Sequence, residues 1–479
     1  MLTTRILAGE GVGYEITSGN RTRRSYGFSP GFSSSADKHL ASRTLGQLRE
    51  YCRMHDRQAS LFSGILDRAL DNIFGSSFDF IPKTGDEGLD KQAKAYIDNR
   101  MLAPACDASG VMDFIDMAKL SIRSVWNDGD VLFAKRPDGS MLSFEADQIE
   151  SPDTRTTGSS RIVQGVELND LNRPVAYWVR QRKTTSTYGG VDTAVNYKRI
   201  AAGNTFMPAY RKRFGQSRGV PYLAAILGTF ERFNNYLDFE QFAAEQNSMF
   251  GWKIKRKPDD NVLAGNETNT DSSTSDVWDK MQKMTHGLML ELEPDEDVEM
   301  FGATRPGDNF SEYVIMCCRL IGVGIGYPLE IMLLDYSKTN YSSGRMGLVE
   351  AKRMFKGWQR FAGAKLCLPW YNWQIARGIA TGELPAKPEL FQVRLQWPAW
   401  EMIDKKKEAE GDTIDVKNRV KSRSQCIRER GEVPDEIFDE IAAETKKLKE
   451  LGIIIDESSE PAKDATQGQI DDTLSDVGE

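Results

Sequence analysis

The side chains that most often catalyse reactions or bind metals are few in this sequence and widely spaced. None of the cysteines and histidines forms a C-x-x-C pair or has the spacing of a zinc site. The adjacent Cys317 and Cys318 lie in an apolar helical pattern, which indicates buried thiols rather than a redox pair. We therefore predict no metal and no cofactor. The residues concerned are Cys52, Cys106, Cys317, Cys318, Cys367 and Cys426, with His39, His55 and His286.

Two glycine-rich segments, Gly9–Gly13 and Gly322–Gly326, superficially suggest a dinucleotide-binding loop. Neither lies between a strand and the start of a helix, and the second follows a helix, where glycine is a common stop. The sequence has no GxxxxGK[ST] phosphate loop, and Glu293–Asp297 lacks the spacing of an EF-hand. These patterns predict a protein that is not an enzyme and that scaffolds or assembles.

The length of 479 residues predicts about three modules at roughly 150 residues each. A net charge of -8 disfavours a surface that grips phosphates, and it would suit a protein past which DNA slides.

No apolar run approaches the ~20 residues that a membrane helix needs, and Met1–Asn20 lacks the apolar core of a signal peptide. We therefore expect no membrane partner and a protein made and used in a cytoplasm.

The apolar periodicity predicts an α+β chain that begins with helices and continues with strands. Helices are expected from about Ser42, over 57–75 and over 114–125, and strands follow. Val131–Lys135 and Met141–Phe144 flank a Pro-Asp-Gly turn, which predicts a hairpin. Ile162–Leu168 is expected to pair with Val175–Arg180.

Three longer helices are expected in the second half of the chain. One follows Pro221, one covers about 311–322 and ends at the glycines before Pro328, and one begins near Asn340–Ser343 and ends before Pro369. Strands are expected in Met289–Phe301. Beyond Pro369 we expect loops, tryptophan-rich segments and two short helices. Residues 1–35 are interpreted as a mobile arm, and residues 456–479, with eight acids and one lysine, as a disordered tail.

Several segments, taken in order, resemble the lambda family of phage portal proteins over roughly residues 40–455. The most specific segment is Arg319–Glu350, in which a glycine-and-proline helix stop precedes the stretch DYSKTNYSSGR. The sequence departs from the family at Thr205–Ala209, where the family usually has a histidine-bearing strand end, and in the long polar insert 257–276. The other matching segments are Arg57–Gly75, Asn127–Val131, Arg213–Pro221, Arg423-Ser424, Gly431–Ile437 and Ile441–Glu444.

The resemblance implies a portal fold that assembles as a ring, with a helical and β-rich wing, stem helices, a β-containing clip and a helical crown. The expected boundaries are 1–35 arm, 36–221 wing, 222–250 stem helix, 251–306 clip, 307–324 stem helix, 325–340 tunnel loop, 341–400 long wing helix and following segment, 401–455 crown, and 456–479 acidic tail.

The resemblance also implies a function and a set of partners. Portal proteins form rings of about twelve copies at one capsid vertex. The ring is the channel for DNA packaging and ejection. The implied partners are further copies of the chain, the terminase large subunit, a head-completion or tail-connector protein, the major capsid and scaffold proteins, and double-stranded DNA passing through the channel.

The site that the resemblance implies is a loop that lines the channel. It comprises Asp335, Tyr336, Ser337, Lys338, Thr339 and Asn340. The residues themselves predict a polar segment between a glycine-closed helix and a helix capped by Asn340 or Ser342. Such a loop suits sliding DNA, and an ordinary surface loop is the alternative. A terminase or nuclease subunit and another head-structural protein are the competing functions, and the first of these would need a phosphate loop or a clustered carboxylate metal site.

Overall fold

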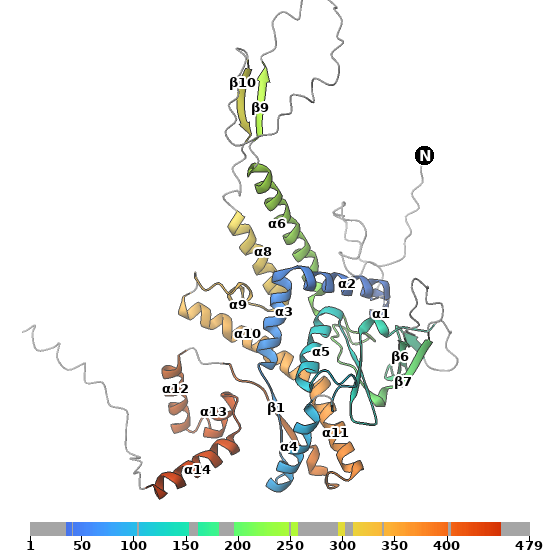
Figure 1. Cartoon of the computed structure of the whole chain (residues 1–479), viewed down its shortest axis with the longest axis vertical. Helices are drawn as coiled ribbons and strands as arrows, with labels where there is room; N and C mark the ends of the chain where they lie inside the picture. Colours follow the sequence, from blue (N-terminus) through green and yellow to red (C-terminus); the bar gives the residue numbers. More distant parts are fainter. Residues whose placement is uncertain are drawn as a thin grey trace, which may run out of the picture. The chain divides into compact units, whose positions relative to one another are not determined.

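The structure is a computed structural model that describes residues 35–40, 42–102, 105–152, 161–181, 196–248, 251–256, 296–301, 310–337, 340–400 and 404–451 (Figure 1). The chain forms two compact units. The first contains Met1–Gly64, Trp126–Gly129 and Tyr210–Met354, and the second contains Ile65–Val125, Asp130–Ala209 and Phe355–Glu479. Helices and antiparallel strands occur in both, so the fold mixes helix and sheet as predicted.

The first unit is built mainly of helices. Helices α6 and α8 run side by side (Figure 1), and Tyr236 of α6 stacks on Phe310 of α8 with ring centroids 5.9 Å apart. β9 and β10 pair antiparallel, from Glu296↔Arg256 to Phe301↔Gly251. The elements are α1 Ala36–His39, α2 Ser42–Gln58, the start of α3 Ser60–Phe74, α6 Leu227–Ser248, β9 Gly251–Arg256, β10 Glu296–Phe301, α8 Phe310–Ile325, α9 Leu329–Leu333 and most of α10 Tyr341–Ala362.

The second unit carries three sheets, all antiparallel, ordered β1-β11, β3-β2-β8 and β4-β5-β6-β7. The strands are β1 Asp79–Pro82, β2 Leu132–Lys135, β3 Met141–Phe144, β4 Arg161–Val163, β5 Val166–Leu168, β6 Pro174–Gln181, β7 Asn196–Ala201, β8 Thr205–Phe206 and β11 Val393–Gln396. The helices are α4 Glu87–Met101, α5 Phe114–Asp128 (whose last residues belong to the first unit), α11 Leu368–Thr381, α12 Lys405–Lys417, α13 Arg423–Glu429 and α14 Pro434–Glu450.

The hairpin predicted around Pro137-Asp138-Gly139 is confirmed. β2 pairs with β3 from Leu132↔Phe144 to Lys135↔Met141, and Gly139 has a φ of 93°. The Asp138 carboxylate accepts hydrogen bonds from the Ser140 hydroxyl and backbone N–H at 2.6 and 2.9 Å. These bonds, the hydroxyl first, lower the pKa of Asp138 because they stabilise its charged form. The turn is thus closed by its own side chains.

An aromatic core fills the second unit. Phe114 stacks on Trp370 with ring centroids 3.9 Å apart, and Phe80 stacks on Tyr371 at 5.4 Å. The Tyr371 hydroxyl donates to the Leu390 carbonyl at 2.9 Å. Burial raises the pKa of Tyr371, so the hydroxyl keeps its proton and remains a donor.

A buried polar contact ties the short segment 126–129 into the first unit. Arg53 Nε lies 2.7 Å from Asp128 Oδ1, and Arg49 Nε donates to the Asp128 carbonyl at 2.9 Å. At Gly129, whose φ is 93°, a Cβ atom would lie 2.6 Å from the backbone carbons of Gly219 and Val220. Two segments that the sequence analysis singled out separately, Asn127–Val131 and Arg213–Pro221, therefore meet through a backbone contact that glycine permits.

Several expectations about secondary structure were wrong. The helix expected after Pro221 is present as α6, but its start was wrong, because a 3-10 turn, Tyr222–Ala225, precedes it. Ile162–Leu168 is two strands, because Gln164 and Gly165 both have positive φ values and form a turn. From Leu368 on, the described residues form α11 to α14, where two short helices were expected. Helix α4 and the β1–β11 pair were not predicted at all.

Pro369 does not end a helix, as the sequence had suggested. A π-helical turn, Gly363–Cys367, follows α10 directly, and Pro369 is the second residue of α11. A proline ring clashes with the carbonyl four residues earlier in a regular α-helix. The wider π turn lies at those residues and lets the helical path continue.

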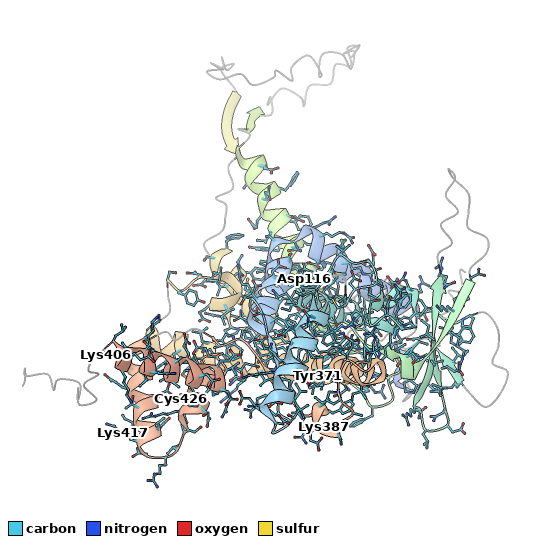
Figure 2. All side chains as sticks on the ribbon, turned by 60° about the horizontal axis from the view of Figure 1, so that its bottom comes forward. Asp116, Tyr371, Lys387, Lys406, Lys417 and Cys426 are labelled. Carbon is cyan, nitrogen blue, oxygen red and sulfur yellow. The ribbon has the colours of Figure 1, made fainter. Side chains whose placement is uncertain are left out.

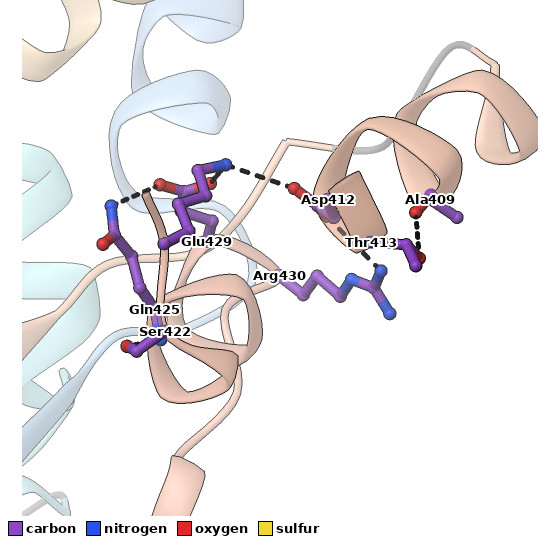
Figure 3. Close-up of polar contacts among 8 residues, drawn as sticks. Ala409, Asp412, Thr413, Ser422, Gln425, Glu429 and Arg430 are labelled. Atoms are coloured by element: carbon purple, nitrogen blue, oxygen red, sulfur yellow. Dashed lines mark hydrogen bonds and ion pairs between the residues drawn. The ribbon is translucent and has the colours of Figure 1, made fainter. Parts of the chain in front are cut away.

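Helices α12 and α13 are joined by an ion-pair cluster (Figure 3). Lys421 Nζ lies 3.2 Å from Asp412 Oδ1 and 2.7 Å from Glu429 Oε2, and Arg430 lies 3.5 Å from Asp412. The hydrogen bond with Glu429 is the main cause of the raised pKa of Lys421. Partial burial would raise the pKa of Glu429, but the hydrogen bonds from Lys421 and Gln425 outweigh it and lower that pKa.

The sign of these shifts predicts how the α12–α13 contact depends on pH. Because the pKa of Glu429 is lowered in the folded chain, its carboxylate stabilises the fold above the usual pKa of 4.5. This stabilisation is lost as the pH falls through the lowered pKa. We expect Lys421→Met to loosen α12 and α13 at neutral pH as acid does in the wild type. Amide hydrogen exchange of residues 404–431 measures this. Lys406→Met, at an exposed lysine of α12, is the control, and equal exchange in both variants would contradict the role of the cluster.

Among the described residues, no helix is both long enough and apolar enough to cross a membrane. The same residues contain no group of three or more histidine, cysteine, aspartate or glutamate side chains placed to hold a metal ion.

Candidate functional site

The predicted loop lies between α9 and α10. Asp335, Tyr336 and Ser337 are exposed, and Asn340 immediately precedes α10 and is also exposed. Lys338 and Thr339 lie outside the described residues. The predicted tunnel loop 325–340 is not a continuous loop, because residues Leu329–Leu333 form the short helix α9.

The glycine stop of α8 forms a regular helix cap. Gly326 has a φ of 73°, and the Tyr327 N–H donates to the Gly322 carbonyl at 2.8 Å, which is the six-to-one bond of a Schellman motif. The same turn brings the Tyr327 carbonyl so close to Gly322 that a Cβ atom at position 322 would clash with it. Glycine is therefore required at 326 by conformation and at 322 by space.

A tyrosine that the sequence analysis did not single out holds the end of α8. The Tyr222 hydroxyl donates to the Ile325 carbonyl at 2.8 Å, and its ring packs on Trp126 with centroids 4.8 Å apart. Gly324 faces the same region, where a Cβ atom would lie 2.5 Å from Ile226 Cγ2. The 3-10 turn Tyr222–Ala225 therefore fixes both the position and the end of α8. The signal in the sequence was a tyrosine directly after Pro221, in a turn that was interpreted as helix.

The chain then enters the loop through a strained residue. Ile331 and Met332 are buried and anchor α9, whereas Leu334 is exposed and has a φ of 53°. A left-handed conformation costs a residue with a Cβ atom about 1–2 kcal/mol. This conformation turns the chain out of α9 and leads into the exposed residues Asp335–Ser337.

Two side-chain hydrogen bonds order the described part of the loop. The Asp335 carboxylate accepts from the Ser337 N–H at 3.0 Å, and the Asn340 side-chain oxygen accepts from the Ser343 N–H at 2.8 Å. The second bond is a helix N-cap, so the prediction that Asn340 or Ser342 caps this helix is confirmed for Asn340. These two hydrogen bonds therefore hold the two ends of the loop.

The thiols next to the site are buried. Cys317 and Cys318 lie on the inner face of α8, which confirms the interpretation made from the sequence. Burial raises the pKa of Cys318, so the thiol stays protonated and is a poor nucleophile. His55 is also buried, and desolvation lowers its pKa, so its imidazole is neutral against Phe62 and Phe230. These environments suit packing rather than catalysis.

The comparisons with known proteins identify the family. A model described as "Phage portal protein, lambda family" matches residues 21–359. The match covers most of the chain, so the chain belongs to the lambda family of phage portal proteins. It is therefore a structural protein of a phage-type virion with a portal, or head–tail connector, function. The resemblance noted in the sequence is confirmed, and the match ends before the C-terminal helices.

The chain is also similar to an individual relative and to chains of solved structures. The chain is 23% identical over 361 residues to the "Probable portal protein" of Halomonas phage phiHAP-1, covering 73% of this chain and 68% of the relative. A chain of the virion of a native gene transfer agent particle is 13% identical, with a TM-score of 0.44 and coverage of 80% of this chain and 93% of that one. A chain from the neck of the empty particle is 14% identical, with a TM-score of 0.45 and the same coverage.

A matched pair of glycine substitutions tests the helix stop. Gly322→Ala places a methyl group against the Tyr327 backbone, so we expect the free energy of unfolding to fall by about 1–3 kcal/mol. Gly228→Ala lies in α6 with nothing within 4 Å, so alanine should stabilise the helix by about 0.5–1 kcal/mol. Urea denaturation measures both values. Shifts of the same sign would contradict the close approach at Gly322.

Proposed function

We propose that the chain assembles into a closed ring of about twelve copies at one vertex of a capsid. Double-stranded DNA passes through its channel, inward during packaging by the terminase large subunit and outward during ejection. The ring is also the docking site for a head-completion or tail-connector protein and contacts the major capsid and scaffold proteins. The role is structural, with no catalytic residue, in the host cytoplasm during assembly and then in the virion. The family match supports this proposal.

We assign the parts of the portal fold as follows within this proposal. Helices α6 and α8 are the stem, and the β9–β10 pair belongs to the clip that meets the motor and the tail connector. The elements of 36–221 and 341–400 form the wing, and α12 to α14 form the crown. The segment Asp335–Asn340 lines the channel.

The observation that carries the ring is a second apolar stripe on α8. The inner stripe, which includes Cys318, Ile321 and Ile325, is buried within the chain. On the other side of the helix the exposed apolar residues follow each other by three, four and three positions. That spacing is typical of a helix seam that another helix covers. The residues of this outer stripe are Tyr313, Met316, Leu320 and Val323.

The neighbouring α6 also exposes large apolar side chains. Phe239 and Phe242 are three residues apart and are mostly exposed. Single exposed apolar residues are common on proteins, but several on two paired helices mark an interaction surface. In a ring each stem helix pair has a neighbour on both sides, so a second copy of the chain is the partner that we propose for these residues.

Leu320→Glu tests this surface. Leu320 is 51% exposed, so the substitution should leave the subunit folded, but in the ring it would place a carboxylate in an apolar interface. We expect closed rings to give way to monomers and small oligomers, measured by light scattering and negative-stain microscopy. Leu120→Glu is the matched control, because Leu120 is 48% exposed on α5. Intact rings with Leu320→Glu would refute the proposed seam.

The described loop residues have the chemistry that a DNA channel requires. Asp335, Tyr336, Ser337 and Asn340 are exposed, and they include no basic side chain to bind phosphate. Lys338, outside the described residues, is the one cation in the sequence of the loop. Because the chain carries a net charge of -8, a ring of many copies is strongly anionic, and a channel of the same sign would keep DNA from adhering.

A basic loop should therefore hinder DNA movement. We expect the double variant Asp335→Lys and Ser337→Lys to form normal rings that bind DNA more tightly, with binding that weakens steeply with salt, and that package DNA more slowly. Filter binding over a salt series and a packaging assay measure these effects. Asp170→Lys together with Asn172→Lys, on the β5–β6 turn, adds the same charge elsewhere. Equal DNA retention in both variants would contradict the assignment of the loop to the channel.

A further inference from the structure

Two helices of the C-terminal segment bury very little within their own chain. All thirteen residues of α12 are described and none is buried, and of the seventeen residues of α14, all described, Pro434 alone is buried. Helices of this length are marginal in water unless a face is packed. Among the described residues of one copy, little therefore covers the outer faces of these two helices.

Helix α12 has two different faces. The inner face carries Asp412, which bonds to Lys421 and Arg430, and the partly buried Glu408 and Val416 on neighbouring turns. Ile414 is two positions from Asp412, about 200° around the helix, and is 56% exposed. The outer face also carries the exposed residues Glu410, Gly411 and Lys417. The apolar Ile414 therefore lies between a negative charge at Glu410 and a positive charge at Lys417. Figure 2 shows Lys417 at the surface.

Helix α14 presents a complementary surface. Phe438 and Ile441 are exposed on it, and next to them Ala442, Thr445, Lys446, Lys449 and Glu450 line a shallow hollow. Asp439 and Glu440 lie in its first half and the lysines in its second half. The surface therefore offers an apolar seat for a branched side chain, with the Asp439 carboxylate towards one end and, towards the other, the ammonium groups of Lys446 and Lys449 beside the Glu450 carboxylate.

The two surfaces fit each other in charge as well as in polarity. Ile414 would fill the hollow beside Ala442, Glu410 would face Lys446, and Lys417 would face Asp439. Gly411, one turn from Ile414, has no atom within 4 Å of a Cβ at its position, so it leaves room for the backbone of a second helix to approach closely. Both surfaces are exposed in the same chain, so they do not cover each other within one copy.

We propose that the outer face of α12 in one copy packs on the outer face of α14 in the next copy. A chain that carries both halves of a complementary pair on separate surfaces associates head to tail, and such a heterologous contact closes into a ring when the rotation between copies permits. The contact rests on the proposed ring and adds a specific interface to it. Residues 404–451 lie beyond residue 359, where the family match ends, so the contact is argued from the residues of this chain.

Site-specific cross-linking tests the contact. The double variant Ile414→Cys and Ala442→Cys places one thiol on each surface, and the six native cysteines are buried, so wild-type protein supplies a low background. After assembly, a short bis-maleimide should produce a ladder of covalent oligomers from the dimer upward on a denaturing gel. Each single variant should give monomers, and a mixture of the two single variants should stop at the dimer.

The outcomes separate this contact from the ring itself. Rings seen by negative-stain microscopy without a ladder in the double variant would overturn the contact and leave the ring intact. Dimers from a single variant would overturn it as well, because they indicate a symmetric contact. A cross-link within one copy would mean that α12 and α14 cover each other. If wild-type protein forms no rings, the proposed function fails, and the contact fails with it.

Discussion

The close backbone contact between Gly129 and the pair Gly219-Val220 is the constraint on which the first unit depends. It fixes the chain just before Pro221, so that Tyr222 is placed against Trp126 and its hydroxyl reaches the end of α8. Asp128, held by Arg49 and Arg53, keeps the other side of the contact in place. The positions of α6, α8 and the loop beyond α9 thus follow from one point where a side chain at Gly129 has no room.

The sequence was most informative where structure is decided locally. The hairpin at Pro137–Gly139, the glycine stop at the end of α8 and the Asn340 cap each depend on residues within a single turn, and all three were predicted. Helix α4 had local signals too, an Asp86 cap and apolar residues every fourth position from Leu89, and these were overlooked. The prediction that Pro369 ends a helix was wrong. Proline usually ends a helix because its ring clashes with the carbonyl four residues earlier, and here a π turn at those residues removes the clash.

Long-range features could not have been predicted in this way. Strand β1 pairs with β11 more than 300 residues later, and neither four-residue segment signals its partner. Likewise, the roles of Tyr222 and Gly129 depend on neighbours brought close by the whole fold. For the candidate site, the loop and its Asn340 cap were predicted from the sequence. Helix α9 and the left-handed conformation of Leu334, which change the direction of the chain, were not predicted. The function itself comes from the family match, and the geometry contributes the surfaces that assembly requires.

The outer stripe of α8 also has a consequence for the life of a newly made subunit. Until it is covered, Met316, Leu320 and Val323 face water on one helix, beside Tyr313, whose ring packs on Tyr236 of α6. Such a surface attracts any other apolar surface, so every free copy is at risk of irregular clumping for as long as it waits. Slow synthesis lengthens that wait and fast synthesis raises the number of simultaneous collisions. The yield of properly closed particles should therefore be highest at an intermediate rate of synthesis, or where a helper protein shields the stripe.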